Sequence, residues 1–128
     1  MTNTTSEPKT EIDFDHLNLY VQGDVNLTQE VFGLFKHQVD MWSRLLQADT
    51  DDETWASVTH SLKGSARAVG AQALADRCER AEGLIGDKAS SGGRLVAVQD
   101  IEFRVSRAIA DIQRWEYQQT LKNMRNPD

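Results

Sequence analysis

The sequence predicts an all-α fold, an antiparallel four-helix bundle with a short additional helix at its N-terminal end. Apolar residues recur at helical spacing through most of the chain, and no stretch shows the long apolar–polar alternation of an amphipathic strand. The two prolines lie near the termini, which leaves the region between them free to form uninterrupted helices. A chain of 128 residues, 39% of them hydrophobic, has material for one core and therefore for one domain.

The pattern divides the chain into three segments. Residues 1–11 are polar and threonine-rich, and we expect them to form a disordered lead. Residues 12–116 carry the helical pattern of the bundle. The pattern fades beyond Trp115, so residues 117–128 are predicted to be a polar C-terminal tail.

The first two helices are predicted from the spacing of their apolar residues. The short first helix should end near Gly23 and carries Ile12, Phe14, Leu17 and Tyr20. The second is longer and strongly apolar, with Leu27, Val31, Leu34, Phe35, Trp42 and Leu45 at helical spacing. We expect this second helix to form much of the core and the short first helix to cover one end of the bundle.

The third helix has recognisable signals at both ends. Thr50 followed by Glu53 three residues later is typical of a capping box, with Thr50 as the N-cap. Gly70 is the candidate for the C-terminal cap. Between them one apolar stripe stays in phase, which predicts a single uninterrupted helix, and it consists of Trp55, Val58, Leu62, Ala66 and Val69.

Two further helices complete the bundle. The fourth is expected from about Gln72 to Ile85, with Cys78 buried on its apolar face. A flexible break at residues 90–93 precedes the last helix, whose apolar positions are Val98, Ile101, Val105, Ile109 and Ile112. Because the chain has one cysteine, it can form neither an internal disulfide nor a cysteine-based zinc cluster. The absence of a signal peptide or a long apolar run predicts a cytoplasmic protein that does not enter the membrane.

The opposite face of the third helix carries His60, Lys63, Gly64 and Arg67. Gly64 lies one turn beyond His60, where glycine costs about 1 kcal/mol relative to alanine. A missing side chain there would let a partner or a phosphoryl group approach the imidazole. The alternative is an ordinary exposed histidine, with Lys-Gly-Ser as a helix stop and new N-cap. The uninterrupted apolar stripe favours the first interpretation.

Charge distinguishes this face from the rest of the chain. The net charge is −6, yet residues 56–75 contain no Asp or Glu, and Lys63 and Arg67 are their only charged residues. A basic face around a histidine suits a site that receives an anion or docks on an acidic surface. The chain lacks the basic surplus that binding to nucleic acid requires, so that class is excluded.

The string His60-Ser61-Leu62-Lys63-Gly64-Ser65, followed by Gly70, resembles the signature of histidine phosphotransfer (HPt) domains. The resemblance extends from about residue 13 to 115, with a Gly23-Asp24 turn near its start and residues 71–86 similar to the helix that follows the signature.

The resemblance implies a phosphorelay. His60 would accept a phosphoryl group on Nε2 from a receiver-domain aspartyl-phosphate and pass it to another receiver, as a stoichiometric carrier and not as an enzyme. Lys63 would neutralise phosphoryl charge, Arg67 would do so or contact the receiver, and Gly64 would give steric access. The partners implied are response-regulator receiver domains and a hybrid histidine kinase. Mg²⁺ would belong to the receiver, so we expect no metal or cofactor on this chain, which should act as a monomer with its His60 face free.

Glu82 departs from the family pattern. It falls on the fourth helix where a polar residue, sometimes glutamine, can hydrogen-bond the other imidazole nitrogen in family members of this layout. A carboxylate could orient the ring and raise its basicity, or repel the incoming phosphoryl group. Alternatively, Glu82 is a surface acid paired with Arg67 or Arg77. Both interpretations remain open at the level of the sequence.

Function classes other than the relay make different demands on these residues. A helical docking module could bind a receiver or kinase through Ser61, Ala68 and Val69 without transferring phosphate. A chain of this length is not expected to be a full sensor kinase, and Ser61 projects to a different face from His60, so the two cannot form a nucleophile–base pair. His16 and His37 lack a neighbouring glycine and cations in phase, which favours structural or surface roles for them.

Overall fold

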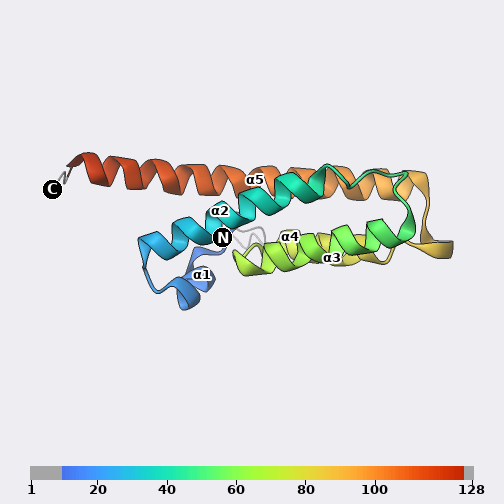
Figure 1. Ribbon diagram of the computed structural model, residues 1–128, viewed down its shortest axis with the longest axis horizontal. Coiled ribbons are helices and arrows are strands. Elements are labelled where there is room, and N and C mark those ends of the chain that lie inside the picture. The colour runs from blue at the N-terminus through green and yellow to red at the C-terminus, as the bar shows by residue number, and fades with distance from the viewer. Residues whose placement is uncertain (1–9, 126–128) are drawn as a thin grey trace, which may run out of the picture.

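The computed structural model describes residues 10–125, and the helices in this range confirm the predicted all-α class (Figure 1). The long helices α2 to α5 run alternately in opposite directions, and α1 is short (Figure 1). A single 3₁₀ turn, η1, connects α4 to α5. The bounds are α1 Phe14–Val21, α2 Val25–Ser43, α3 Asp52–Ala68, α4 Gln72–Glu82, η1 Gly86–Lys88 and α5 Ser91–Arg125.

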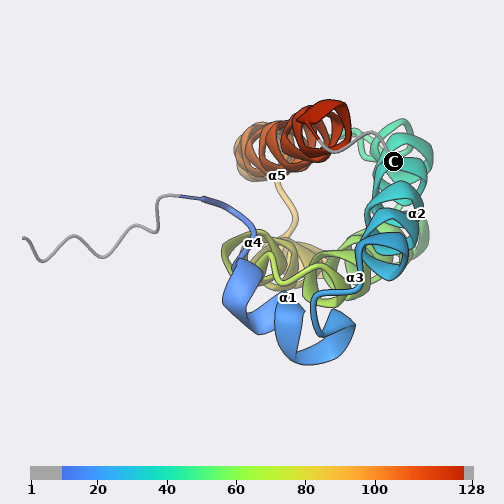
Figure 2. The same cartoon turned by 90° about the vertical axis from the view of Figure 1, so that its left-hand side faces the viewer.

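The four long helices form a closed bundle, as an end-on view shows (Figure 2). Helix α3 packs against α2 and α4, and α5 packs against the same two helices from the other side, so α3 and α5 lie diagonally opposite each other (Figure 2). Helix α1 lies at the end of the bundle where α2 begins and α3 ends (Figure 1). This arrangement leaves one flank of α3 facing solvent.

The apolar stripe of α3 forms the centre of the core. All five of its predicted members are buried, with at most 1% of their surface exposed. Phe32 of α2 packs edge-on against Phe14 of α1 at 6.2 Å and against Trp115 of α5 at 5.3 Å between ring centroids. These contacts join three helices around one aromatic cluster.

The two ends of α3 are fixed by different local structures. Its N-cap is Asp51, whose carboxylate accepts a hydrogen bond from the Thr54 amide, and the prediction of Thr50 as N-cap was wrong. The Thr50 hydroxyl instead donates to the Leu45 carbonyl in the preceding loop. Asp is preferred over Thr at an N-cap, and the Thr50 hydroxyl is already engaged in the loop, so the adjacent Asp51 takes this position.

The predicted cap at Gly70 is confirmed. Gly70 has φ +79°, its amide donates to the Arg67 carbonyl at 3.2 Å, and the Ala71 amide donates to the Ala66 carbonyl at 2.8 Å. This is a Schellman motif, which favours glycine because of the positive φ. The Gly70 carbonyl then accepts from the Asp13 amide at 2.9 Å and positions the start of α1.

The predicted disordered lead includes a residue that the structure holds in the interior. Residues 1–9 lie outside the described residues, but Glu11 is buried, against the expectation for residues 1–11. Asp111 of α5 accepts hydrogen bonds from the amides of Glu11 and Ile12, at 2.7 and 2.9 Å. The Glu11 carboxylate faces the guanidinium groups of Arg104 and Arg107 at 3.3 and 3.2 Å. These charges on α5 explain how a polar residue is held in the interior.

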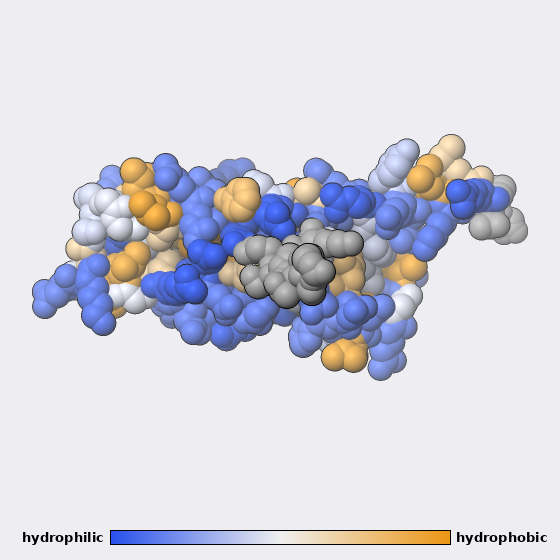
Figure 3. Space-filling model, turned by 180° about the vertical axis from the view of Figure 1, so that it is seen from behind, coloured by the Kyte–Doolittle hydropathy of each residue, from blue (hydrophilic) through white to orange (hydrophobic). Residues whose placement is uncertain are grey.

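The last two helices also differ from their predicted bounds. Helix α4 ends at Glu82, and Ile85, expected on its buried face, is 38% exposed in the loop that follows. Helix α5 continues through the predicted tail to Arg125, beyond the end of the other helices (Figure 1). No helix among residues 10–125 is long and apolar enough to cross a membrane. Seen from behind, the surface is largely hydrophilic with separate apolar patches (Figure 3).

Candidate functional site

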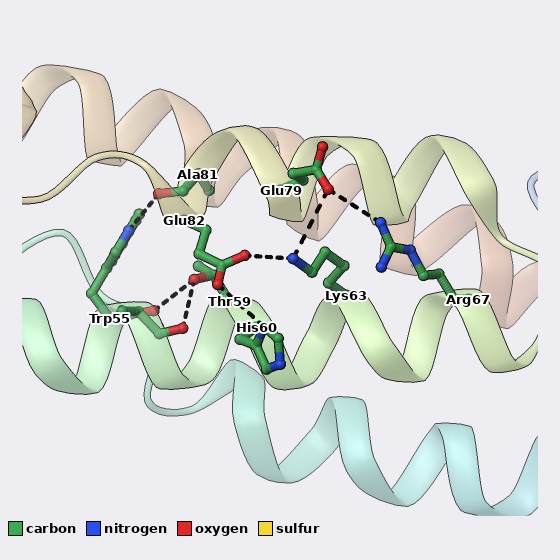
Figure 4. Close-up of polar contacts among 9 residues, drawn as sticks. Trp55, Thr59, His60, Lys63, Arg67, Glu79, Ala81 and Glu82 are labelled. Atoms are coloured by element: carbon green, nitrogen blue, oxygen red, sulfur yellow. Dashed lines mark hydrogen bonds and ion pairs between the residues drawn. The ribbon is translucent and has the colours of Figure 1, made fainter.

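His60 lies on the solvent-facing side of α3, which runs between α2 and α4 in this view (Figure 4). Its side chain is 69% exposed, and the helix around it is anchored by the buried Trp55 and Leu62. Trp55 also donates from its indole nitrogen to the Ala81 carbonyl at 2.7 Å, which ties α3 to the end of α4. The imidazole is therefore accessible but carried by a rigid support.

Glu82, the last residue of α4, contacts the imidazole. Its Oε2 lies 3.2 Å from His60 Nδ1, and its Oε1 lies 2.8 Å from Lys63 Nζ (Figure 4). Glu82 is thus paired with His60 and Lys63, and not with Arg67 or Arg77 as the alternative interpretation proposed. Arg77 pairs instead with Asp100 of α5 at 2.9 Å.

The electrostatics of this contact favour an ionised carboxylate. The hydrogen bond from Lys63 is the main cause that lowers the pKa of Glu82 below its ordinary value, partial burial opposes it, and the Lys63 charge and the His60 contact lower the pKa further. A carboxylate at a helix C-terminus faces the negative end of the helix dipole, so its position depends on these contacts from α3. The ionised Glu82 can only accept hydrogen bonds from its two neighbours.

The cations on this face are less free than the sequence suggests. The Lys63 side chain is only 13% exposed and lies within ion-pair distance of both Glu82 and Glu79, at 2.8 and 3.9 Å. Arg67 points toward Glu79, at 3.1 Å, and away from His60 (Figure 4). The α4 carboxylates thus offset the basic face predicted from α3 alone. Sequence analysis missed Glu79, although its spacing of three residues from Glu82 places both acids on one side of α4.

Gly64 leaves an opening beside the imidazole. A Cβ built on Gly64 would meet no atom within 4 Å, so nothing inside the protein requires glycine at this position. Gly64 also has an ordinary helical backbone. In the described part of the chain, the glycines with positive φ are Gly23, Gly70 and Gly86. Space on the outside of the helix is therefore what glycine provides here.

An apolar groove adjoins this opening on the side of α2. Leu34, Gln38, Ser65 and Ala68 line a shallow groove with Ser61, Gly64 and Trp42, and the same four also line a deeper groove of about 400 Å³ that reaches α1. The Ser65 hydroxyl donates to the Gln38 side-chain oxygen at 2.6 Å where the two grooves meet. Leu34 is 57% exposed despite its place in the predicted core pattern of the second helix. On the α4 side, His60 thus contacts the carboxylate of Glu82. On the α2 side, the adjoining shallow groove is uncharged and partly apolar.

The other chemically interesting residues do not join this site. His16 and His37 are both exposed, and within residues 10–125 neither imidazole has a hydrogen-bond partner. Cys78 is buried on α4 as predicted. The described part of the chain contains no group of three or more His, Cys, Asp or Glu residues that could hold a metal ion.

Comparisons with known proteins agree with this geometry. The model of the Hpt domain family matches residues 26–124, which is most of the chain. The fold is similar to the crystal structure of the histidine phosphotransferase ShpA from Caulobacter crescentus, with a TM-score of 0.72, 28% sequence identity, and coverage of 89% of this chain and 98% of that one. A comparison with curated proteins gave no match. The chain therefore belongs to the Hpt domain family, the histidine phosphotransfer carriers of phosphorelays.

Proposed function

We propose that this protein accepts a phosphoryl group on His60 from the aspartyl-phosphate of one receiver domain and donates it to the aspartate of another. The observation that carries the proposal is the accessible His60 imidazole beside the empty position at Gly64. Phosphoryl transfer needs mainly in-line positioning and neutralisation of charge, and an exposed imidazole on a rigid helix meets the first need.

Nε2 is the nucleophilic atom in this proposal. The contact between Nδ1 and Glu82 occupies the other ring nitrogen and leaves Nε2 directed away from α4 (Figure 4). Neutral imidazole is a good nucleophile, and the carboxylate holds the ring in one orientation. Lys63 lies one turn from His60 and would neutralise the phosphoryl oxygens.

The grooves beside Gly64 support docking of a receiver domain on α2 and α3. Most of the side chains that line them are apolar or uncharged, and the grooves reach from the opening beside Gly64 to α1. A receiver seated there would approach Nε2 from the α2 side and avoid the carboxylates of Glu79 and Glu82. Arg67 lies at the edge of the deeper groove and could contact an acidic surface of that receiver. Mg²⁺ would be held by the receiver's own acidic residues.

In this role the protein is a carrier that acts stoichiometrically. It needs its His60 face uncovered for successive partners, in the monomeric state that we propose or in any assembly that leaves α3 free. A hybrid histidine kinase with an attached receiver would be a suitable donor.

The test is reconstitution of a relay. A phosphorylated donor receiver is mixed with an acceptor receiver from the same organism, with and without this protein, and label on the acceptor is followed over short times. The proposal predicts that label reaches the acceptor only when the protein is present, in proportion to its amount. Binding of both receivers without any label on this chain would favour the docking module instead.

A further inference from the structure

Both carboxylate oxygens of Glu82 are engaged, and each has a different partner. Oε1 accepts from Lys63 and Oε2 lies 3.2 Å from His60 Nδ1. An ionised carboxylate has no proton to donate, so this contact is a hydrogen bond only when Nδ1 carries the proton. The resting imidazole thus has its proton on the α4 side and its lone pair on Nε2.

We propose that Glu82 keeps this proton on Nδ1 after His60 is phosphorylated, so that the phosphoryl group enters and leaves Nε2 without any proton transfer. This inference rests on the proposed function. Glu82 is then a positioning residue both for entry and for exit of the phosphoryl group, because it acts through the imidazole ring and does not touch the phosphoryl group.

The electron balance of the two halves shows why the proton matters. On entry, the Nε2 lone pair forms the P–N bond, and the P–O bond breaks with its electron pair going to the donor aspartate. The product is a phosphorylated, cationic ring that still carries Nδ1–H. On exit, an acceptor carboxylate oxygen forms the new P–O bond, and the P–N electron pair returns to Nε2. With Nδ1 protonated the leaving group is neutral imidazole, whereas without that proton it is an imidazolate anion, which leaves far less readily.

The surroundings of the ring make Glu82 the group that can hold this proton. The nearby charges on α3 are Lys63 and Arg67, which disfavour a cationic ring, and Glu79 on α4 faces those two cations instead of the imidazole. From α2 the groove beside His60 presents Leu34, Gln38 and Trp42, all uncharged. The ion pair with Lys63 also keeps Glu82 ionised, in agreement with its lowered pKa, so the proton stays on the ring and not on the carboxylate.

The test measures the ring titration of the phosphorylated protein directly. A background in which His16 and His37 are replaced by Gln leaves His60 as the single histidine of the three. This protein, its Glu82→Gln form and its Glu79→Gln form are loaded chemically with phosphoramidate. Phosphohistidine is then followed by ³¹P NMR on freshly loaded samples, from alkaline pH down to mildly acidic pH, because the P–N bond is acid-labile. Glu82→Gln retains an acceptor oxygen and loses only the charge, and Glu79→Gln removes the same charge without touching His60.

The inference predicts a titration midpoint that is lower in Glu82→Gln by about one pH unit or more, since an adjacent opposite charge shifts a titrating group by this amount. Glu79→Gln should keep a midpoint close to that of the parent. Equal midpoints in the parent and Glu82→Gln, or equal shifts in both variants, would overturn the inference while label on His60 from a phosphorylated receiver still supports the proposed function. Failure of a phosphorylated receiver to label His60 in the parent would overturn the proposed function, and this inference with it.

Discussion

Lys63 and Glu82 form a 2.8 Å ion pair across the interface of α3 and α4, one helical turn from His60. In the unphosphorylated protein the Lys63 ammonium is therefore paired with the Glu82 carboxylate. The ammonium has three N–H donors, so it can keep its bond to Glu82 and donate another to a phosphoryl group on His60. The ion pair with Glu82 thus positions the Lys63 ammonium close to the site of phosphorylation.

This arrangement predicts a selective loss in Lys63→Met. Methionine retains the mostly covered aliphatic stem and removes the charge, so we expect phosphotransfer to slow about tenfold, the equivalent of one charge-assisted hydrogen bond. Arg67→Met is the comparison, because Arg67 points away from His60 toward Glu79 and should affect transfer only through docking, and therefore less. Single-turnover transfer from a phosphorylated receiver measures both. A wild-type rate in Lys63→Met would remove Lys63 from the mechanism.

Gly64→Ala should separate stability from activity. Because the added methyl group meets no atom within 4 Å, alanine should raise the free energy of unfolding by up to about 1 kcal/mol. The same methyl group narrows the approach to His60, so transfer should slow. Gly33→Ala on α2 is the control, since it also adds a methyl group in open space but on a different helix from His60. Urea unfolding and transfer rates check the pair, and equal transfer rates in the two variants would contradict the role of Gly64.

Arg94 should be a main determinant of stability at the other end of the bundle. Its buried guanidinium donates to the carbonyls of Leu84 and Thr50 and to Asp52, at 3.0, 2.6 and 2.6 Å, and lies 4.5 Å from the centre of the Trp55 ring. Arg94→Met removes these contacts, and we expect a loss of about 2–4 kcal/mol in the free energy of unfolding.

The control for Arg94 is Arg44→Met, whose side chain is 76% exposed in a surface ion pair. It should change the free energy of unfolding by no more than about 0.5 kcal/mol. Urea unfolding gives both values. Equal changes in the free energy of unfolding for the two substitutions would contradict a large contribution of the Arg94 contacts to stability.

Cys78 should resist thiol reagents in the folded protein. Burial raises the pKa of Cys78 to about 12, so almost no thiolate forms at pH 8 and the sulfur is also covered. The unfolded thiol loses its proton near its ordinary value of 9.0, so this group's contribution to stability is complete below that pH and is lost as the pH rises toward 12. Labelling kinetics at pH 8 should follow global unfolding. Rapid labelling of the native state would show that α4 opens locally.

The sequence predicted the parts of this structure that depend on neighbouring residues. The buried stripe from Trp55 to Val69, the exposed face with His60 and the cap at Gly70 follow from helical periodicity and from the backbone preference of glycine. These features place the imidazole without knowledge of any distant contact.

The features that sequence analysis missed depend on residues far apart in the chain. Glu11 looks like part of a polar lead, and only its packing on Asp111 and Arg104, about 100 residues later, explains its burial. The acids that neutralise Lys63 and Arg67 come from a different helix. The choice between Thr50 and Asp51 as N-cap is a local exception, because it depends on the contact of the Thr50 hydroxyl with the Leu45 carbonyl in the preceding loop.

The central claim is tested most directly by transfer of label from a phosphorylated receiver domain to the wild-type chain and to His60→Gln. Because His60 is exposed, the variant should unfold within about 0.5 kcal/mol of the wild type, which shows that any loss of label is not a loss of fold. The account predicts acid-labile, alkali-stable label on the wild type alone. Label on folded His60→Gln, or no label on a wild-type chain that binds the receiver, would contradict it.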